Sequence, residues 1–237
     1  MADYDLYYWP MPFRGQFIRA LLAHAGKDWR EHDAEAIGKL MEAKPAEQPI
    51  AFMGPPVLVD RTNGFALAQM PAIALYLGET LKLLPDTPQA RAVTAKIVND
   101  ANDVIDELTL NGGRQMWSDK SWAAFLPRLR HWMTIWESTA ARPATGADDA
   151  FLLGTPTASV VDIVTATLWG TMGDRLPPLA ALLESTAPRT AALTRRVNAT
   201  APLAQLSQNT MQRYGDAYCG GQIEASLRKV VMGHAPA

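Results

Sequence analysis

The sequence predicts an α/β region followed by an all-helical region, because the character of the chain changes near residue 80. Before that point, short runs rich in aromatic and β-branched residues alternate with helical stripes, as expected for strands mixed with helices. After Leu83-Leu84-Pro85-Asp86 the strand-like runs end, and apolar residues recur at helical spacing over long segments. The sequence therefore predicts two domains, residues 1–82 and residues 87–237, joined by a proline-marked linker.

The first region contains its elements in the order strand, helix, strand, hairpin and helix. Tyr4–Trp9 is an aromatic run typical of a strand, and residues 13–25 carry the apolar stripe of a helix. Trp29–His32 predicts an edge strand. Residues 57–67 predict a hairpin, because two apolar runs flank a polar turn that contains Asn-Gly. Pro71–Leu77 predicts a short helix that begins at proline, which the first turn of a helix tolerates.

The second region contains only helical patterns. An apolar stripe over residues 93–108 predicts a long helix, and residues 122–139 predict another. Ser159-Val160-Val161-Asp162 predicts a helix start, since the serine and the aspartate of a capping box bond each other's free N–H groups. Further helices are expected at residues 179–183 and 190–198, whereas the last thirty residues give no clear pattern.

The composition limits the function classes. With 48% apolar residues, 19% charged residues and a formal charge of −2, the chain can bury a core and lacks the basic excess that nucleic-acid binding needs. An acidic start and the lack of a long apolar run predict a cytoplasmic protein without a membrane partner. Cys219 is the single cysteine, so no intramolecular disulfide forms, and the scattered histidines predict no metal site.

Four segments in order resemble the glutathione transferase family. Tyr4–Trp9 followed by Arg14-Gly15 looks like the first strand and helix start of its tyrosine-type classes. Pro56–Asp60 resembles the strand that begins with a cis-proline, and Leu67–Ile73 occupies the position of the Gln-Ser-x-Ala-Ile glutathione segment. Gly154–Asp162 is similar to the capping box of the central C-terminal helix. The resemblance implies a thioredoxin-like N-terminal domain and an all-helical C-terminal bundle. It also implies that glutathione is the co-substrate, that the protein is a homodimer, and that its role is detoxification.

Tyr8 is the catalytic residue that the resemblance implies. The reaction needs a thiolate, yet a free thiol with a pKa of ~8.5 is only a few per cent ionised at pH 7. A tyrosine hydroxyl at a helix N-terminus can donate to the sulfur and lower that pKa. Two alternatives stay open: Tyr8 is a packing residue, or Met11 occupies the activating position of the serine- and cysteine-type classes. Since methionine cannot donate, only backbone N–H groups would then activate the thiol.

Two changes in the glutathione segment predict weak binding. Pro55 lacks the N–H that would pair with the cysteinyl unit, and Met70 replaces the serine whose hydroxyl holds the γ-glutamyl carboxylate. We expect a millimolar dissociation constant, roughly −4 kcal/mol. Gln69 is retained, either as a ligand contact or as a solvated turn residue. Arg14 pairs either with a ligand carboxylate or with a surface acid.

The apolar co-substrate is expected between the domains, where Met11, Phe13 and Met116 are candidate pocket residues. Two functions follow from these features. The first is an enzyme that conjugates the glutathione thiol to a small apolar electrophile. The second is a binding or scaffold protein that keeps the fold but has lost productive glutathione binding.

Overall fold

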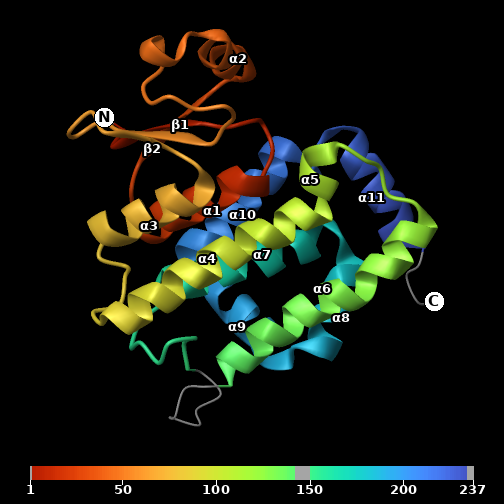
Figure 1. Ribbon diagram of the computed structural model, residues 1–237. Helices are drawn as coiled ribbons and strands as arrows, with labels where there is room; N and C mark the ends of the chain where they lie inside the picture. Colours follow the sequence, from red (N-terminus) through yellow and green to blue (C-terminus); the bar gives the residue numbers. More distant parts are fainter. Residues whose placement is uncertain (1, 142–149, 234–237) are drawn as a thin grey trace.

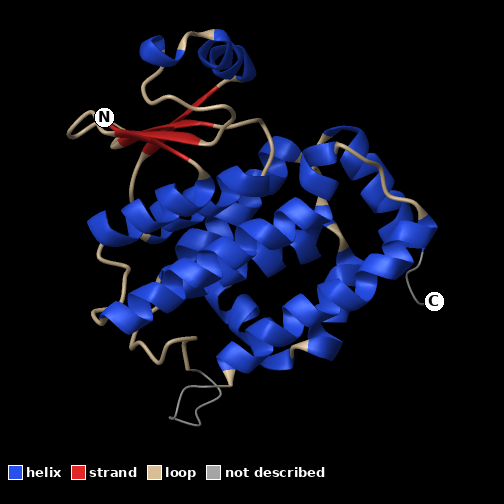
Figure 2. Cartoon of the chain, in the orientation of Figure 1, coloured by secondary structure: helices blue, strands red, loops and turns tan. Residues whose placement is uncertain are grey.

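The computed structural model describes residues 2–141 and 150–233, and its strands form one layer against a large helical mass (Figures 1 and 2). The sheet has the order β2–β1–β3–β4. Strand β1 (Tyr4–Tyr7) is parallel to β2 (Trp29–His32) and antiparallel to β3 (Val57–Asp60), which pairs antiparallel with β4 (Ala66–Ala68). The predicted edge strand and the predicted hairpin are both confirmed.

Helices cover both faces of this sheet. Helices α1 (Phe13–His24) and α3 (Met70–Thr80) lie on one side, and α2 (Ala34–Glu42) lies on the other, followed by a 3₁₀ turn at Pro45–Glu47 (Figure 1). The thioredoxin-like arrangement expected for the N-terminal region is therefore present.

Helix α2 has no counterpart among the predicted elements. It begins where the Asp33 side chain accepts the N–H of Ala36 at 2.8 Å, a typical N-cap. Only Ile37 of this helix is buried, so its apolar stripe is too short to stand out in the sequence.

The described part of the chain after α3 is mostly helical, as predicted. Its helices are α4 (Pro88–Leu108), α5 (Leu110–Gly113), α6 (Asp119–Ala140), α7 (Val160–Arg175), α8 (Pro177–Thr186), α9 (Pro188–Asn198), α10 (Ala201–Tyr214) and α11 (Gly221–Gly233). The segment without a clear sequence pattern thus contains the second half of α10 and all of α11. Among the described residues, no helix combines the length and the apolar character needed to cross a membrane.

Helix α7 lies at the centre of the helical region and is buried along most of its length. The predicted capping box begins it: Asp162 accepts both the N–H of Ser159 at 2.9 Å and its hydroxyl at 2.7 Å. Helix α1 packs against α7 and α10, while α3 packs against α4, so one continuous core joins the two regions (Figure 1). This contact places the first turn of α1 beside elements from the far end of the chain.

Candidate functional site

The predicted site residues converge at one edge of the sheet. The strand register pairs Tyr7 with Val57, and Val57 with Ala68. Tyr8 follows Tyr7 at the end of β1, Pro56 precedes Val57 at the start of β3, and Gln69 follows Ala68 at the end of β4. The three strands therefore bring these residues to the same end of the sheet. The peptide bond between Pro55 and Pro56 is cis, which confirms the expectation from the sequence.

Tyr8 lies beneath the first turn of α1. Its hydroxyl oxygen accepts the backbone N–H of Arg14 at 3.1 Å, and the residue is only 4% exposed. Its ring packs directly on Gly15, where an added Cβ would come within 2.3 Å of a ring carbon. Gly15 therefore permits the close approach that holds the Tyr8 hydroxyl at the positive end of the α1 helix dipole.

The hydroxyl of Tyr8 is protonated at neutral pH. Burial raises the pKa of Tyr8 to about 12, although the Arg14 side chain and its N–H act in the opposite direction. The hydroxyl oxygen of Tyr8 already accepts one hydrogen bond, and its proton remains available to be donated in a second one. Among the described contacts of Tyr8, none is an acceptor for this proton. The arrangement suits an acceptor that arrives with a ligand.

A segment from the C-terminal end of the chain, Tyr218–Gly220, covers this region. The Tyr218 ring packs edge-on against Phe13, with centroids 5.5 Å apart. An added Cβ on Gly220 would lie 2.8 Å from the terminal methyl of Met11, so the backbone there touches the Met11 side chain. We call Tyr218–Gly220 the covering segment, since it packs on Met11 and Phe13 and places Cys219 close enough to Tyr8 to act on its pKa.

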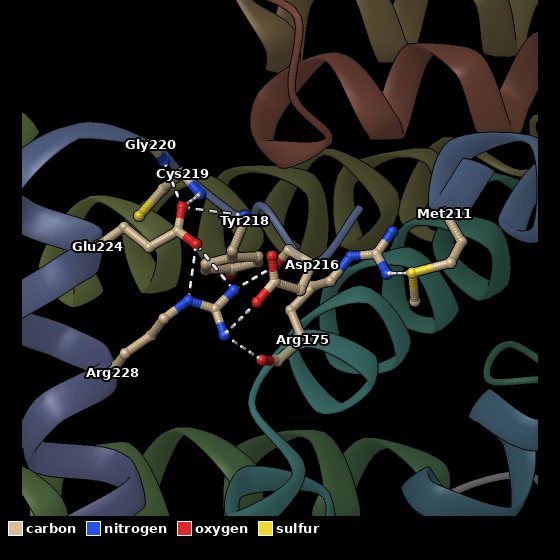
Figure 3. Close-up of polar contacts among 8 residues, drawn as sticks. All are labelled: Arg175, Met211, Asp216, Tyr218, Cys219, Gly220, Glu224 and Arg228. Atoms are coloured by element: carbon tan, nitrogen blue, oxygen red, sulfur yellow. Dashed lines mark hydrogen bonds and ion pairs between the residues drawn. The ribbon is translucent and has the colours of Figure 1, made fainter. Parts of the chain in front are cut away.

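Glu224 fixes the covering segment in place (Figure 3). One of its carboxylate oxygens accepts the N–H groups of Tyr218, Cys219 and Gly220, at 3.0, 2.9 and 2.6 Å. The other accepts Arg228 Nε at 2.8 Å. Burial alone would raise the pKa of Glu224, but these backbone donors and Arg228 outweigh it and hold that pKa below its usual range. The Glu224 carboxylate is therefore ionised at neutral pH.

Cys219, in the middle of the covering segment, is a free thiol that stays protonated. Burial raises the pKa of Cys219 to about 12, with a smaller contribution from the charge of Glu224. Because the thiolate is the nucleophilic form, this cysteine has no catalytic character at neutral pH.

At the start of α3, the predicted glutathione positions differ in their exposure. The Met70 side chain is 1% exposed and belongs to the core, whereas Gln69 is exposed. Gln69 has φ 74° and ψ 119°, a conformation that costs a residue with a side chain about 1–3 kcal/mol. Since Pro71 has no N–H, the early donors of this helix are the N–H groups of Met70 and Ala72. The strand register places them next to Pro56.

Arg14 connects the two regions of the chain. Its guanidinium donates to Asn102 at 3.2 Å and to Asp106 at 3.1 Å, both on α4. Of the two alternatives for Arg14, this geometry corresponds to pairing with an acid of the chain.

The three candidate pocket residues all contact the C-terminal end of the chain. Met11 and Phe13 both touch the covering segment, but Met116 contacts Ser226, farther along α11, through its sulfur at 3.7 Å. Met116 is 42% exposed. Sequence reasoning missed the covering segment, Glu224 and Arg228. The available signal was Gly220-Gly221 followed by Glu224 and Arg228 at a spacing of four, which is typical of a helix start with an ion pair.

Comparison with known proteins gives consistent results. A family model described as "Glutathione S-transferase, C-terminal domain" matches residues 93–230. A search of curated proteins finds no significant match. The solved structure of NaGST-2 superposes with a TM-score of 0.69 at 19% identity, and it covers 88% of this chain and 97% of its own. A solved structure of NaGST1 gives a TM-score of 0.70 at 20% identity, with the same coverage. At these identities, the two structures support the fold alone.

Proposed function

Because the chain belongs to the glutathione S-transferase family, we propose that it joins the thiol of glutathione to a small apolar electrophile and binds glutathione weakly. One observation carries this proposal: the protonated Tyr8 hydroxyl lies at the N-terminus of α1 with its proton left to donate. A sulfur anion is the acceptor that this hydroxyl suits, since both the O–H and the helix dipole favour negative charge.

In the proposed reaction, the Tyr8 hydroxyl donates a hydrogen bond to the thiolate of glutathione. A two-unit fall in the thiol pKa corresponds to about 2.7 kcal/mol, and a hydrogen bond to a charged group contributes about 1.5–3 kcal/mol. The sulfur lone pair then attacks the electrophilic carbon, and the leaving group departs with its bonding electrons. Since Tyr8 is 4% exposed, the covering segment has to move aside for the sulfur to reach the hydroxyl.

The remainder of glutathione is proposed to lie along the start of α3. The N–H groups of Met70 and Ala72 would hold the γ-glutamyl carboxylate, and the carbonyl of Pro55 would accept a single hydrogen bond from the cysteinyl unit. The rare backbone conformation of Gln69 fits a ligand-contacting turn, because such conformations cluster at binding sites. No serine hydroxyl and no second main-chain bond are available at these positions, so we expect a millimolar dissociation constant, roughly −4 kcal/mol.

A second candidate is a non-catalytic binding or scaffold protein. The covering segment favours it, since Glu224 holds three successive backbone N–H groups over the surroundings of Tyr8. If this contact persists when ligand is bound, sulfur does not reach the hydroxyl and the fold acts without chemistry.

Calorimetric titration and a conjugation assay separate the two. We expect millimolar binding of glutathione, tighter binding of S-hexylglutathione, and slow conjugation to an activated nitroaryl chloride. Tyr8→Phe should reduce turnover at least tenfold and leave the dissociation constant nearly unchanged. Tyr7→Phe is the matched control, because Tyr7 points to the opposite face of β1 and stacks on His32 at 3.9 Å.

Three other results would change the proposal. Low-micromolar binding of glutathione would show that Pro55 and Met70 cost little affinity. Full activity of Tyr8→Phe would assign thiol activation to the backbone N–H groups of α1. Binding of S-hexylglutathione with no turnover at all would favour the non-catalytic function.

We further propose that the protein is a homodimer in which residues 99–106 of α4 lie near the partner. Three of the four acids at positions 100–107 are compensated by ion pairs within the chain: Asp100 pairs with Lys96, Asp106 with Arg14, and Glu107 with Arg128, whereas burial and these neighbouring acids raise the pKa of Asp103. Such compensation lowers the repulsion between two copies of the helix. Light scattering at micromolar concentration should give twice the chain mass, and a monomer would refute the proposal.

A further inference from the structure

A groove with a volume of about 400 Å³ lies between strand β2 and helix α10. Trp29 and Glu31 of β2 line it, together with Arg19 and Ala23 of α1 and residues of α10 between positions 202 and 214. Several of the α10 residues that line it are exposed, so the groove is open to solvent. The candidate glutathione residues Tyr8, Pro55, Gln69 and Met70 are not among its lining residues.

Strand β2 has a free edge, because it stands at the end of the sheet. The carbonyl of Asp28 accepts the N–H of Tyr4 at 3.3 Å and therefore points toward β1. Backbone groups point to alternate edges along a strand, so the groups of residues 30 and 32 also point toward β1. The N–H and C=O groups of Trp29 and Glu31 then point away from the sheet. Within the described residues, these groups form no hydrogen bond with a loop, helix or side chain.

Arg213 gives the groove an unpaired positive charge. The charged residues of its lining are Arg19, Glu31 and Arg213. Arg19 holds both carboxylate oxygens of Glu31, and one of these oxygens also accepts Trp29 Nε1 at 2.8 Å. Arg213 is exposed and lies 5.3 Å from the centre of the Tyr214 ring, and it forms no ion pair within the described residues. Although its charge helps to lower the pKa of Glu31, one carboxylate among two guanidinium groups leaves a net charge of +1.

We propose that an extended segment of a partner protein adds to the free edge of β2 and places an acidic side chain opposite Arg213. Two residues with free N–H and C=O groups on one edge match the main chain of a strand, which supplies affinity in this mode of recognition. The Trp29 ring and Ala23 offer apolar contact to a neighbouring side chain of the segment. A second copy of β2 is a poorer occupant, because it would bring the positive groove of one chain against that of the other.

Two short peptides test the charge preference. The first is acetyl-Thr-Val-Glu-Val-Thr-amide, and the second has lysine in place of glutamate. In an NMR titration of the full chain, the acidic peptide should shift the backbone amide signals of Trp29 and Glu31. The lysine peptide should bind about tenfold more weakly, since a hydrogen-bonded charge pair is replaced by a repulsion.

Arg213→Gln should weaken binding of the acidic peptide about tenfold and remove the preference for glutamate over lysine. Because Arg213 is exposed, this change should leave the fold intact. Arg130→Gln is the matched control, since Arg130 is an exposed arginine of α6 that does not line the groove, and it should retain both the affinity and the preference.

N-methylated peptides test the main-chain pairing. One peptide carries an N-methyl group on its glutamate and another on the valine that precedes it, so only one of the two loses an N–H that faces β2. One should therefore lose binding and the other should retain most of it.

Four results would overturn the proposal. These are no binding of the acidic peptide at millimolar concentration, equal affinity for the glutamate and lysine peptides, equal affinity for the two N-methylated peptides, and binding that leaves the Trp29 and Glu31 amide signals unshifted. Hydrogen exchange without peptide separates the remaining occupant. Protection of these two amides that grows with protein concentration would assign the edge to a second copy and overturn the proposal, whereas concentration-independent exchange would support a different partner.

Discussion

The surroundings of Tyr8 and the helical region each contain a buried arginine, and the two arginines differ in their partners. Arg19, which is 2% exposed, holds both carboxylate oxygens of Glu31 at 2.7 and 2.9 Å and donates to the carbonyl of Met11 at 2.9 Å. Arg175, at 5% exposure, donates to the sulfur of Met211 at 2.9 Å and forms no ion pair within the described residues, and burial lowers its pKa more than Asp174 and other nearby acids raise it. The two side chains are therefore similarly buried, but within the described residues only the charge of Arg19 is paired with a carboxylate.

This difference separates an arginine held rigidly by a carboxylate from one whose charge is only partly compensated. A buried ion pair with complete hydrogen bonding fixes one geometry, as Arg19 and Glu31 do between α1 and β2. The guanidinium of Arg19 also lies 5.8 Å from the centre of the Tyr8 ring, so the pair supports the catalytic candidate.

The largest effect is expected for Glu31→Ala. This change leaves the Arg19 charge buried without its partner and should lower the free energy of unfolding by about 3–5 kcal/mol. Urea denaturation at neutral pH measures the loss. Glu35→Ala is the control, because the exposed Glu35–Lys39 pair should contribute less than about 1 kcal/mol. A loss below 1 kcal/mol for Glu31→Ala would remove the distinction between the two arginines.

The pH dependence of the same pair has a definite sign. Burial alone would raise the pKa of Glu31, but the hydrogen bonds and charge of Arg19 outweigh it and hold that pKa below the usual value. Because the folded-state pKa is lowered, the stabilisation is complete above about pH 4.3, the ordinary glutamate value. It is lost as the pH falls from about 4.3 through the folded-state pKa, so over that interval the stability of Glu31→Ala should depend less on pH than that of the wild-type chain.

Glu224→Gln is expected to have an intermediate effect on the covering segment. A neutral amide accepts the three N–H groups less strongly, and each hydrogen bond to a charged group contributes about 1.5–3 kcal/mol. Opening of the segment should become about tenfold to hundredfold more frequent. Because Cys219 is the single cysteine, the rate of reaction with a thiol reagent measures this opening directly. Glu184→Gln is the control, and an unchanged rate in Glu224→Gln would show that Glu224 does not hold the segment.

Patterns local in the sequence predicted most of the fold. The strands, the hairpin, the helix of Pro88–Leu108 and the capping box at Ser159 all depend on residues a few positions apart, and all are present. The cis bond at Pro55-Pro56 was also correctly expected, from the family resemblance. Helix α2 was missed because Ile37 is its only buried residue.

Contacts between distant parts of the chain could not be predicted in this way. The covering segment lies about two hundred residues from Tyr8, and no periodicity links Gly220 to Met11. The groove between β2 and α10 leaves no signal either, since a hollow between elements depends on how side chains pack rather than on where apolar residues recur. In the sequence, Arg175 is an ordinary basic residue at a helix C-terminus.

Tyr8→Phe should have a small effect on stability, in contrast to its effect on turnover. The substitution removes the acceptor of the Arg14 N–H but keeps the ring against Gly15. We expect a loss of about 0.5–1.5 kcal/mol in the free energy of unfolding, measured in urea. A loss above 3 kcal/mol would indicate that the hydroxyl has a structural role, and the activity of this variant would then say little about thiol activation.

The smallest effect is expected for Arg175→Met. Methionine preserves the aliphatic packing of the side chain and removes a buried charge that has no carboxylate partner. The free energy of unfolding should therefore change by less than about 1 kcal/mol, whereas the loss for Glu31→Ala is several times larger. A large loss of stability in Arg175→Met would mean that Met211 and the surrounding dipoles already compensate the charge, and the two buried arginines would then have the same structural role.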